Sequence, residues 1–439
     1  MFWVPLYAAL LVISTAATYL TAISMADSPK HSTRKLNLWV SLATNFGMLA
    51  VFKYYNFFSE NLNGAFSAFN LTYSLPLFDL LLPLGISFHT FQAVGYSLEV
   101  YQGRVKPERH LGIFALYCCF FPQLVAGPIE RPNHLLPQLH AHFDFDYSRV
   151  ATGLKRMAWG FFLKLVIADN LAVYVNRVYG TPHDFSGPSL LLATYFFAFQ
   201  IYCDFAGYTA IALGTAHVMG YELLENFNRP YFAKSISEFW RRWHISLSTW
   251  FRDYLYIPLG GSRVPLFRFA GNIMAVFLVC GLWHGAKWTF VVWGGLHGLM
   301  IVFSVLTKRS RETIARRMKL DSEGFGFAAY RGFITFTLVC FSWIFFRASS
   351  LDDAWYIVTH LFANLAEGLP KDENFPRIAL NCILIAFLLS AEWIPKETGA
   401  KEYLAAKLRP YRWLGYVTMI LAIWFLGEFS SSDFLYFKF

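Results

Sequence analysis

Long apolar runs separated by short polar and basic segments dominate this chain. Runs of 18 or more mostly apolar residues recur along its length, and runs of that length are typical of transmembrane helices. Strands of a membrane barrel would instead show apolar alternation over about ten residues. Because lipid offers no partner to backbone polar groups, continuous apolar runs favour helices. The pattern predicts an all-α polytopic membrane protein.

Twelve apolar segments are candidate spans. They are 2–25, 37–57, 79–100, 111–127, 152–175, 189–220, 268–284, 288–306, 328–347, 351–365, 376–394 and 412–430. Segments 111–127 and 351–365 are the weakest, and a re-entrant or interfacial position is an alternative for both. We expect about 11 transmembrane helices in one membrane-embedded domain, residues 1–439. The first segment is predicted to be a retained span, because no basic residues precede it as they would in a signal peptide.

Composition agrees with this interpretation. Of 439 residues, 56% are hydrophobic and 15% are charged, and the mean hydropathy is +0.40, whereas soluble domains carry about a quarter charged residues. The net charge of +9 lies in short loops, as the positive-inside bias requires, so it does not indicate a nucleic-acid partner. The six cysteines all fall in apolar segments, which argues against a disulfide framework or a zinc ribbon.

Loop charges predict the orientation. The basic segments 30–35, 103–109, 308–319 and 396–413 should face the cytoplasm, whereas 58–78, 176–188 and 366–375 should face outward. With 111–127 re-entrant, both termini lie outside. Residues 221–267 mix aromatic, basic and polar residues too densely for a lipid-facing span, so we expect an interfacial or re-entrant helix on the cytoplasmic side. No internal repeat supports an inverted-repeat transporter.

Eight histidines and acidic residues inside predicted spans are candidates for a role, because an ionisable group there is costly and normally faces a cavity or a partner. Five lie near span ends, where contact with interfacial water is the simpler interpretation. These five are His89, Glu99, Asp169, His217 and Glu392. The other three, Asp204, His284 and His297, are the stronger candidates for a functional role.

His284, in "GLWHGAKW", is the strongest candidate. A neutral imidazole accepts a proton near pH 7, so histidine is the usual general base. Gly281 and Gly285 leave room for a ligand or another backbone, and Trp283 and Trp288 would supply rigid walls. A buried histidine that makes one hydrogen bond within the bundle is the alternative.

His297 is expected to support the structure, whereas the role of Asp204 is open. The glycines around His297 suit close helix packing, which favours a packing or hydrogen-bonding role. Asp204 must pair with a cation, and an Arg or His from residues 229–263 would serve. Ion pairing and a direct role for Asp204 both remain open.

His244 lies in "FWRRWHISLS", where Arg241 and Arg242 add cationic donors beside aromatic residues. Such a surface suits the phosphates of coenzyme A or of a phosphorylated carrier. An interfacial helix that binds anionic lipid is the alternative. P-loop, GxGxxG and HExxH motifs are absent, so the sequence offers no motif for nucleotide hydrolysis or zinc proteolysis, and we expect no metal site.

Five motifs follow one another in order: "FFPQLVAGPIERP" (120–132), "DFAGYTAIALG" (204–214), "ENFNRPY" (225–231), "FWRRWHISLSTWFRDYLYIPLGGSR" (239–263) and "GLWHGAKWTFVVWGGLHG" (281–298). Together they resemble the membrane-bound O-acyltransferase (MBOAT) superfamily, in its bacterial alginate O-acetylation branch. The core motifs occupy residues 80–300, and the whole chain fits the size of the family.

The resemblance implies a helical bundle around a central tunnel in a bacterial inner membrane. His284 matches the family's catalytic histidine, and His244 matches its second active-site position. Asp204 matches a recurrent polar position, and "FLYFKF" at the C-terminus is similar to the aromatic tail of this branch. A partner of the extracytoplasmic serine-hydrolase-like (SGNH) type, or the polysaccharide itself, would take the acyl group. The implied donor is acetyl-CoA or another acyl thioester, with no bound cofactor.

Two positions depart from the branch. Ala210 stands where a second acidic residue is common, which weakens any argument from paired carboxylates. Glu99 replaces the commoner aspartate, which is a smaller change.

The expected reaction is acyl transfer from a cytoplasmic thioester to a hydroxyl reached from outside. His284 would accept the hydroxyl proton, and His244 would support the developing oxyanion. Arg241, Arg242 and Arg252 would hold the phosphates of the donor, and Trp283 would line the site. D-alanyl or other acyl transfer to cell-wall polymers is one alternative, and a transporter or flippase with an intramembrane proton relay is another.

Overall fold

The computed structural model describes residues 6–78, 83, 85–317, 324–369, 374–393, 409–430 and 434–435. Within this part of the chain every regular element is helical and no strand is present. Most of the basic segment 396–413, and residues 436–439 of the aromatic tail, lie outside the described residues. The predicted all-α class is therefore confirmed.

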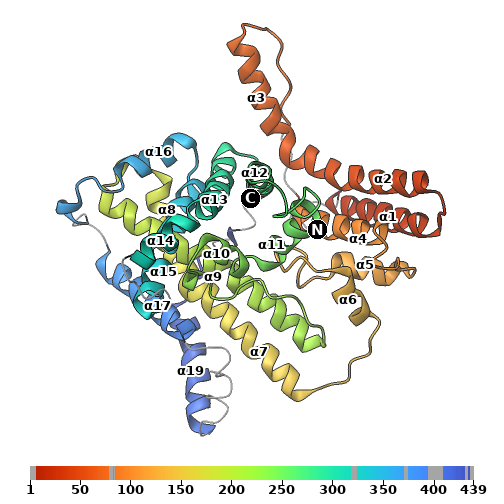
Figure 1. The fold of residues 1–439 in the computed structure, drawn as a ribbon. Coiled ribbons are helices and arrows are strands. Elements are labelled where there is room, and N and C mark those ends of the chain that lie inside the picture. The colour runs from red at the N-terminus through yellow and green to blue at the C-terminus, as the bar shows by residue number, and fades with distance from the viewer. Residues whose placement is uncertain are drawn as a thin grey trace.

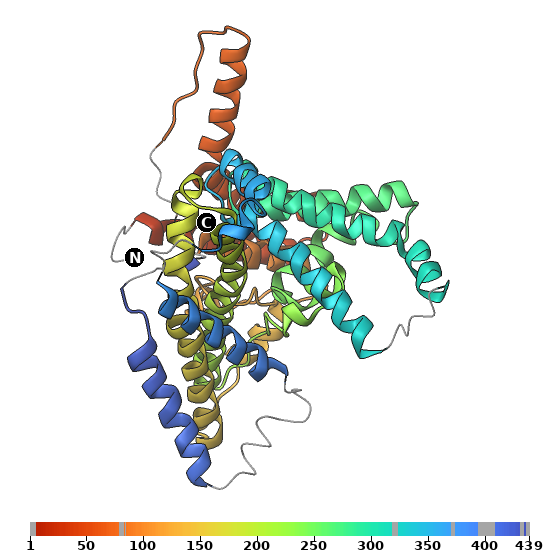
Figure 2. The same cartoon turned by 90° about the vertical axis from the view of Figure 1, so that its left-hand side faces the viewer.

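The N-terminal part forms a layer of helices (Figure 1), and its α4 contacts the rest of the molecule through Phe88 and Phe91, which pack on Trp283 and Trp250. Its elements are α1 (Leu6–Asp27), α2 (His31–Leu49), η1 (Ala50–Tyr54), α3 (Tyr55–Ala68), α4 (Ile86–Tyr101), α5 (Leu111–Cys119) and α6 (Pro132–Leu139). A π-helical turn, η1, joins α2 to α3, and α3 projects away from the body in both views (Figures 1 and 2).

The central part surrounds one long helix. Its elements are α7 (Tyr147–Phe161), η2 (Phe162–Ala168), α8 (Asp169–Gly180), η3 (Pro182–Asp184), α9 (Gly187–Met219), η4 (Pro230–Phe232), α10 (Ile236–Arg242), α11 (Ile245–Phe251) and η5 (Arg252–Tyr256). The helix α9 is mostly buried and packs along α7, η2 and α8. At 33 residues and 1.5 Å per residue it is about 50 Å long.

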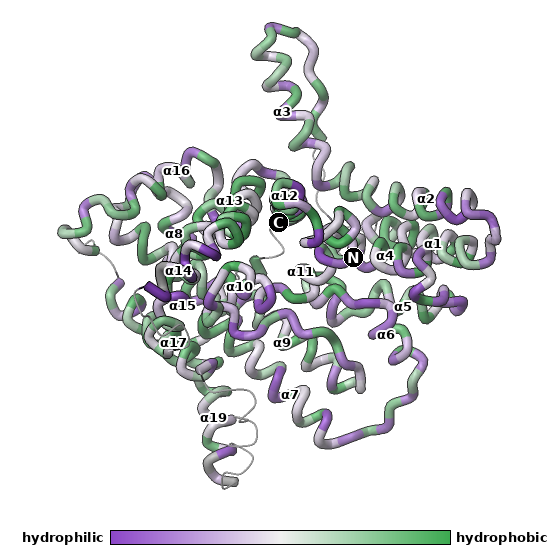
Figure 3. Tube along the Cα trace, viewed as in Figure 1, coloured by the Kyte–Doolittle hydropathy of each residue, from purple (hydrophilic) through white to green (hydrophobic). Residues whose placement is uncertain are grey.

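The C-terminal part packs against α10 through α13 and α15, and against η5 through α12. Its elements are α12 (Leu266–His284), α13 (Trp288–Leu306), α14 (Lys308–Arg317), α15 (Phe325–Arg347), α16 (Leu351–His360), η6 (Leu365–Glu367), α17 (Phe375–Trp393) and α19 (Arg409–Leu426). Hydropathy along the trace separates the apolar α12 and α13 from the basic, hydrophilic α14 (Figure 3).

Seven helices of the described chain are long and apolar enough to cross a membrane, which supports a multi-pass membrane protein. They are Tyr7–Asp27, Tyr147–Gly180, Gly187–Met219, Leu266–His284, Trp288–Leu306, Phe325–Arg347 and Phe375–Trp393. The predicted total of about 11 stays a prediction. The two weakest predicted spans form only α5, with nine residues, and α16, with ten, and helices of that length cannot cross about 30 Å of hydrocarbon.

Residues 221–267 form short helices whose aromatic faces point inward. Trp240, Trp243, Leu247 and Trp250 are all buried, and α10 and α11 have seven residues each. The interfacial or re-entrant position stays a prediction, and the aromatic face packs into the core rather than facing lipid. A segment that enters the bundle, as the re-entrant alternative expects, agrees with this packing.

Candidate active site

His284 is the last residue of α12, and its imidazole lies in an aromatic enclosure. The ring centroids of Trp283, Trp293 and Phe346 are 4.9, 5.0 and 5.3 Å from that of His284, and each meets it edge to face. The side chain is buried, with 3% of the residue exposed. Trp283 therefore forms part of the wall, as predicted.

The prediction that Trp288 forms the opposite wall is wrong. Trp288 is 51% exposed, and its Nε1–H donates to Asn61 Oδ1 at 2.7 Å. As the first residue of α13 it faces the outside of the helix pair, and Trp293 in the middle of α13 takes its place beside His284.

The turn between α12 and α13 is tight because two positions lack a side chain. A Cβ at Gly281 would lie 2.3 Å from the carbonyl oxygen of Phe290, and one at Gly285 would lie 2.2 Å from the Phe290 ring. The expected close approach is thus confirmed, and at both glycines the neighbour is Phe290 rather than a ligand.

His244 caps the N-terminus of α11 and is fully buried. Its backbone is left-handed, with φ +43° and ψ +55°, a conformation that most side chains avoid and that His, Asn and Asp tolerate best. Its imidazole meets the ring of Phe205 edge to face at 4.7 Å and stacks on Phe88 at 6.2 Å.

The two candidate histidines meet at the ring of Trp283. The centroid of the Trp283 ring is 6.2 Å from that of His244 and 4.9 Å from that of His284. Phe88, on α4, also contacts Trp283, at 5.4 Å. Through the Trp283 ring the structure therefore brings together the two residues that the sequence singled out.

His297 has the hydrogen-bonding role that was predicted for it. The indole N–H of Trp240 donates to His297 Nδ1 at 3.2 Å, and the hydroxyl of Ser342 lies 2.9 Å from Nε2. These contacts tie α10 and α15 to α13 behind Trp293, whose ring lies 5.1 Å from that of His297.

The three predicted phosphate-binding arginines lie apart from this enclosure. Arg241 is exposed. Arg242 donates to Glu238 at 2.6 Å and, over longer distances, to the backbone carbonyl oxygens of Asn228 and Arg229. Arg252 is 58% exposed and pairs with Asp253 at 2.8 Å. Their role in donor binding stays a prediction.

Asp204 pairs with a lysine, so the predicted partner from residues 229–263 is wrong. Lys164 Nζ lies 2.8 Å from Asp204 Oδ1 and 2.8 Å from Asp169 Oδ1, and all three side chains are buried. The backbone N–H of Leu435 donates to Asp204 Oδ2 at 2.9 Å. Because α7, η2 and α8 run beside α9, Lys164 reaches Asp204 before any residue of 229–263 does. Ala210, where the branch has a second acid, is buried further along α9.

The interfacial interpretation is wrong for two of the five residues to which it was applied. Asp169 belongs to the ion cluster just described. His89 is 2% exposed, and its Nε2 lies 2.8 Å from the hydroxyl of Ser14. The other three, Glu99, His217 and Glu392, are partly exposed; Tyr254 donates to Glu99 at 2.7 Å, and Tyr202 donates to Glu392.

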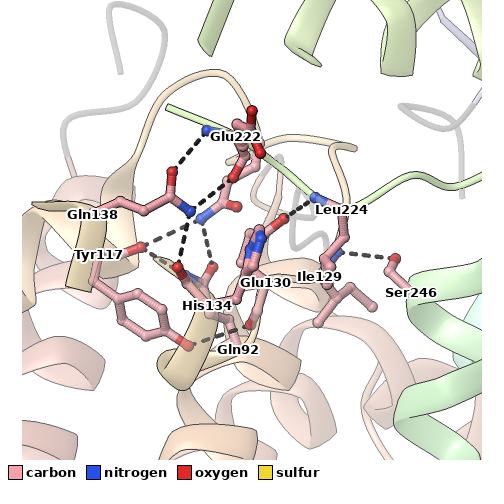
Figure 4. Close-up of polar contacts among 10 residues, drawn as sticks. Gln92, Tyr117, Ile129, Glu130, His134, Gln138, Glu222, Leu224 and Ser246 are labelled. Atoms are coloured by element: carbon pink, nitrogen blue, oxygen red, sulfur yellow. Dashed lines mark hydrogen bonds and ion pairs between the residues drawn. The ribbon is translucent and has the colours of Figure 1, made fainter. Parts of the chain in front are cut away.

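A buried carboxylate anchors the loop that leads to His244 (Figure 4). Glu130 Oε1 accepts from the backbone N–H of Leu224 at 2.6 Å, and Oε2 lies 2.7 Å from His134 Nδ1. The Ser246 hydroxyl contacts the backbone N–H of Ile129 at 3.0 Å. The "GPIER" motif thus holds the segment before α10 and the first turn of α11 in one network.

The sequence interpretation did not single out two lysines that lie inside predicted spans and make buried contacts. Lys164 lies in η2 and Lys53 in η1, and both segments are π-helical, as is common where a helix carries a functional group. Each lysine interrupts an apolar run, "GFFLKLVIA" and "LAVFKYY". Counting lysines among the costly intramembrane groups would have found them.

Comparison with known proteins agrees with the motifs. Residues 110–346 match the sequence profile of MBOAT, the membrane-bound O-acyltransferase family. The chain is 36% identical to a probable alginate O-acetylase AlgI of Azotobacter vinelandii over 378 residues, which cover 86% of this chain and 72% of that protein. It is 33% identical to a peptidoglycan O-acetyltransferase of Helicobacter pylori over an alignment of 493 residues, which covers 100% of this chain and 89% of that protein.

A more distant relative modifies another polymer. A teichoic acid D-alanyltransferase of Streptococcus thermophilus is 31% identical over 300 residues, covering 62% of this chain and 70% of that protein. Since the family profile covers more than half of the chain and the O-acetylase relatives cover more still, the chain belongs to the membrane-bound O-acyltransferase family, in its bacterial O-acetylation branch, and is an acyltransferase.

Proposed function

We propose that this enzyme moves an acetyl group from a cytoplasmic thioester, acetyl-CoA or a related donor, to a hydroxyl on the far side of the bacterial inner membrane. The acceptor is an exported or cell-envelope polysaccharide, or a serine of an extracytoplasmic SGNH-type partner that passes the group on. The whole chain acts as one membrane domain, with its core motifs in residues 80–300. The observation that carries the proposal is the meeting of His244 and His284 at the Trp283 ring.

His284 would act as the general base. As the acceptor oxygen attacks the thioester carbonyl, His284 takes the hydroxyl proton. When the tetrahedral intermediate collapses, the carbon–sulfur bond breaks, and the protonated His284 returns the proton to the leaving thiolate. A base of this kind contributes about 10²- to 10⁴-fold to the rate. The aromatic enclosure supports this step because it excludes water that would hydrolyse the thioester.

His244 would donate a hydrogen bond to the carbonyl oxygen as negative charge develops there. Its rigid place at the start of α11 supports this role, since preorganised donors stabilise an oxyanion without rearrangement. Arg241 and Arg252 are exposed and would meet the donor phosphates outside the enclosure, and Arg242 would hold the loop behind them through its carbonyl contacts.

D-alanyl transfer is the second candidate, and the relation to a D-alanyltransferase favours it. Its lower coverage of this chain, 62% against 86%, makes acetyl transfer the better supported reaction. A transporter or flippase is not favoured, because the relatives are named as transferases.

The test uses the full chain in proteoliposomes with radiolabelled acetyl-CoA outside and oligosaccharides of alginate or peptidoglycan inside. We expect label to reach an internal oligosaccharide in the wild type and not in His284→Ala. Transfer only from a D-alanyl carrier protein would favour the second candidate. Transfer that persists in His284→Ala would overturn the assignment of the base.

A further inference from the structure

Lys53 reaches from the N-terminal layer to the end of the helix that carries His284. Its Nζ donates to the backbone carbonyl oxygen of Trp283 at 2.6 Å and to that of His284 at 3.3 Å. It lies 3.5 Å from the hydroxyl of Ser87 and 5.8 Å from the centroid of the Trp283 ring. Lys53 thus contacts the backbone of the last two residues of α12 from outside that helix.

The end of α12 needs such a group. The last four carbonyl groups of a helix have no partner within the helix, and a left-handed glycine after the last residue commonly supplies the missing bonds. Here Gly285 is extended instead, with φ −165° and ψ 144°, and its N–H makes only a long bond of 3.3 Å to Gly281 O. A cation at a helix C-terminus also interacts favourably with the helix dipole.

Three acceptors surround the Lys53 nitrogen, so its hydrogen bonds are made without a substrate. A lysine ammonium carries three N–H groups, and Trp283 O, His284 O and Ser87 Oγ provide three acceptors. Lys53 holds the backbone that carries the His284 imidazole. The Lys53 ammonium group also lies over the ring of Trp283, which adjoins that imidazole.

We propose that Lys53 is a positioning residue for the acyl-transfer base: it replaces the missing C-cap of α12 and holds His284 and Trp283 against α4. The inference rests on the proposed role of His284. Lys53 acts through the backbone of α12, so its loss should misplace the base and lower turnover more than it weakens donor binding. A displacement of about 1 Å at a reacting group can cost on the order of 10²-fold in rate.

Three variants of the full chain test this. In Lys53→Met the side chain keeps its length and loses its donors, and in Lys53→Arg the donors are restored. Lys155→Met is the matched control. Lys155, on α7, also has its ammonium group over an aromatic ring, that of Tyr416 at 5.3 Å. Turnover and KM are measured with radiolabelled acetyl-CoA and the oligosaccharide that the wild type uses, and folding is checked by thermal unfolding in detergent.

We expect Lys53→Met to lower kcat by about 10- to 100-fold with little change in the KM for acetyl-CoA, Lys53→Arg to recover most of kcat, and Lys155→Met to behave as the wild type. Wild-type kcat in Lys53→Met, or a change confined to KM, would overturn the inference. If Lys53→Met does not fold, Lys53→Arg decides: a folded Arg variant without recovered kcat contradicts the inference. Activity in His284→Ala would instead overturn the proposed function, whatever the Lys53 variants do.

Discussion

The His244 imidazole and the Trp283 indole lie with their ring centroids 6.2 Å apart, and His284 adjoins the same indole at 4.9 Å. The first histidine starts a short helix and the second ends a long one. Two helix termini therefore converge on one aromatic ring, and each proposed catalytic group is positioned by the end of a helix.

Because the backbone of His244 is left-handed, two substitutions can test its chemical role and its structural role separately. Asparagine tolerates φ +43°, whereas valine in that region costs about 1–2 kcal/mol. We expect His244→Asn to fold with nearly wild-type thermal stability and to lose about 10²- to 10³-fold in kcat, because the shorter asparagine side chain withdraws its N–H from the position of the imidazole donor. His244→Val should lose the same activity and also unfold at a lower temperature. Wild-type turnover in His244→Asn would remove His244 from the mechanism.

The buried ion cluster predicts unequal effects for its members. Asp204→Asn leaves the Lys164–Asp169 pair intact at 2.8 Å, whereas Lys164→Met leaves two carboxylates buried without their cation. Removing one partner of a buried pair costs about 3–5 kcal/mol. We therefore expect the unfolding temperature of Lys164→Met to be well below that of Asp204→Asn when both are measured at the same scan rate. Equal unfolding temperatures would show that the cluster does not hold α9 in place.

The pair formed by Glu130 and His134 predicts a pH-dependent stability. The hydrogen bond with Glu130 raises the pKa of His134, so the pair stabilises the fold fully below the unfolded pKa of about 6.5 and loses that effect as pH rises through the raised value. The difference in unfolding temperature between wild type and His134→Gln should be larger at about pH 6 than at about pH 8.5. A difference that does not vary with pH would contradict this.

The contact between α12 and α13 predicts opposite effects on stability when two glycines of α12 are replaced by alanine. Gly281→Ala places a methyl group against the Phe290 carbonyl, and overpacking of this kind costs about 1–3 kcal/mol. Gly271 has nothing within 4 Å of its added Cβ, so Gly271→Ala should be neutral or raise stability by up to about 1 kcal/mol. Thermal unfolding of both variants in the same detergent checks the pair. The packing account is wrong if Gly281→Ala is as stable as Gly271→Ala.

The sequence predicts long elements well here because span length and apolar composition decide them. The structure has α13 at the predicted residues 288–306 and α9 within two residues of the predicted 189–220. Periodicity cannot say which side chains meet between helices. For that reason the partner of Asp204 was assigned to the wrong segment, while the hydrogen-bonding role of His297 was predicted from its glycine-rich surroundings.

The same limit applies to the site. The motifs predict that His244 and His284 belong together, and the structure joins them through Trp283. Trp288 could not be told from Trp293 by sequence, because both follow His284 in an apolar, tryptophan-rich run, and only the start of α13 decides which one faces inward. Lys53 could have been noticed as a lysine inside an apolar run, but its contacts with backbone atoms follow no motif that would predict its role.

The central claim is that the carbonyl of the donor thioester lies beside His284 inside the aromatic enclosure. The most direct test is a cryo-EM structure of the full chain with a non-hydrolysable thioether analogue of acetyl-CoA. We expect the atom that replaces the thioester carbonyl carbon to lie between His244 and His284, with a site for the acceptor oxygen within about 3–3.5 Å of that carbon and of the His284 imidazole. An analogue bound with its acyl end outside the ring of Trp283, Trp293 and Phe346 would contradict it.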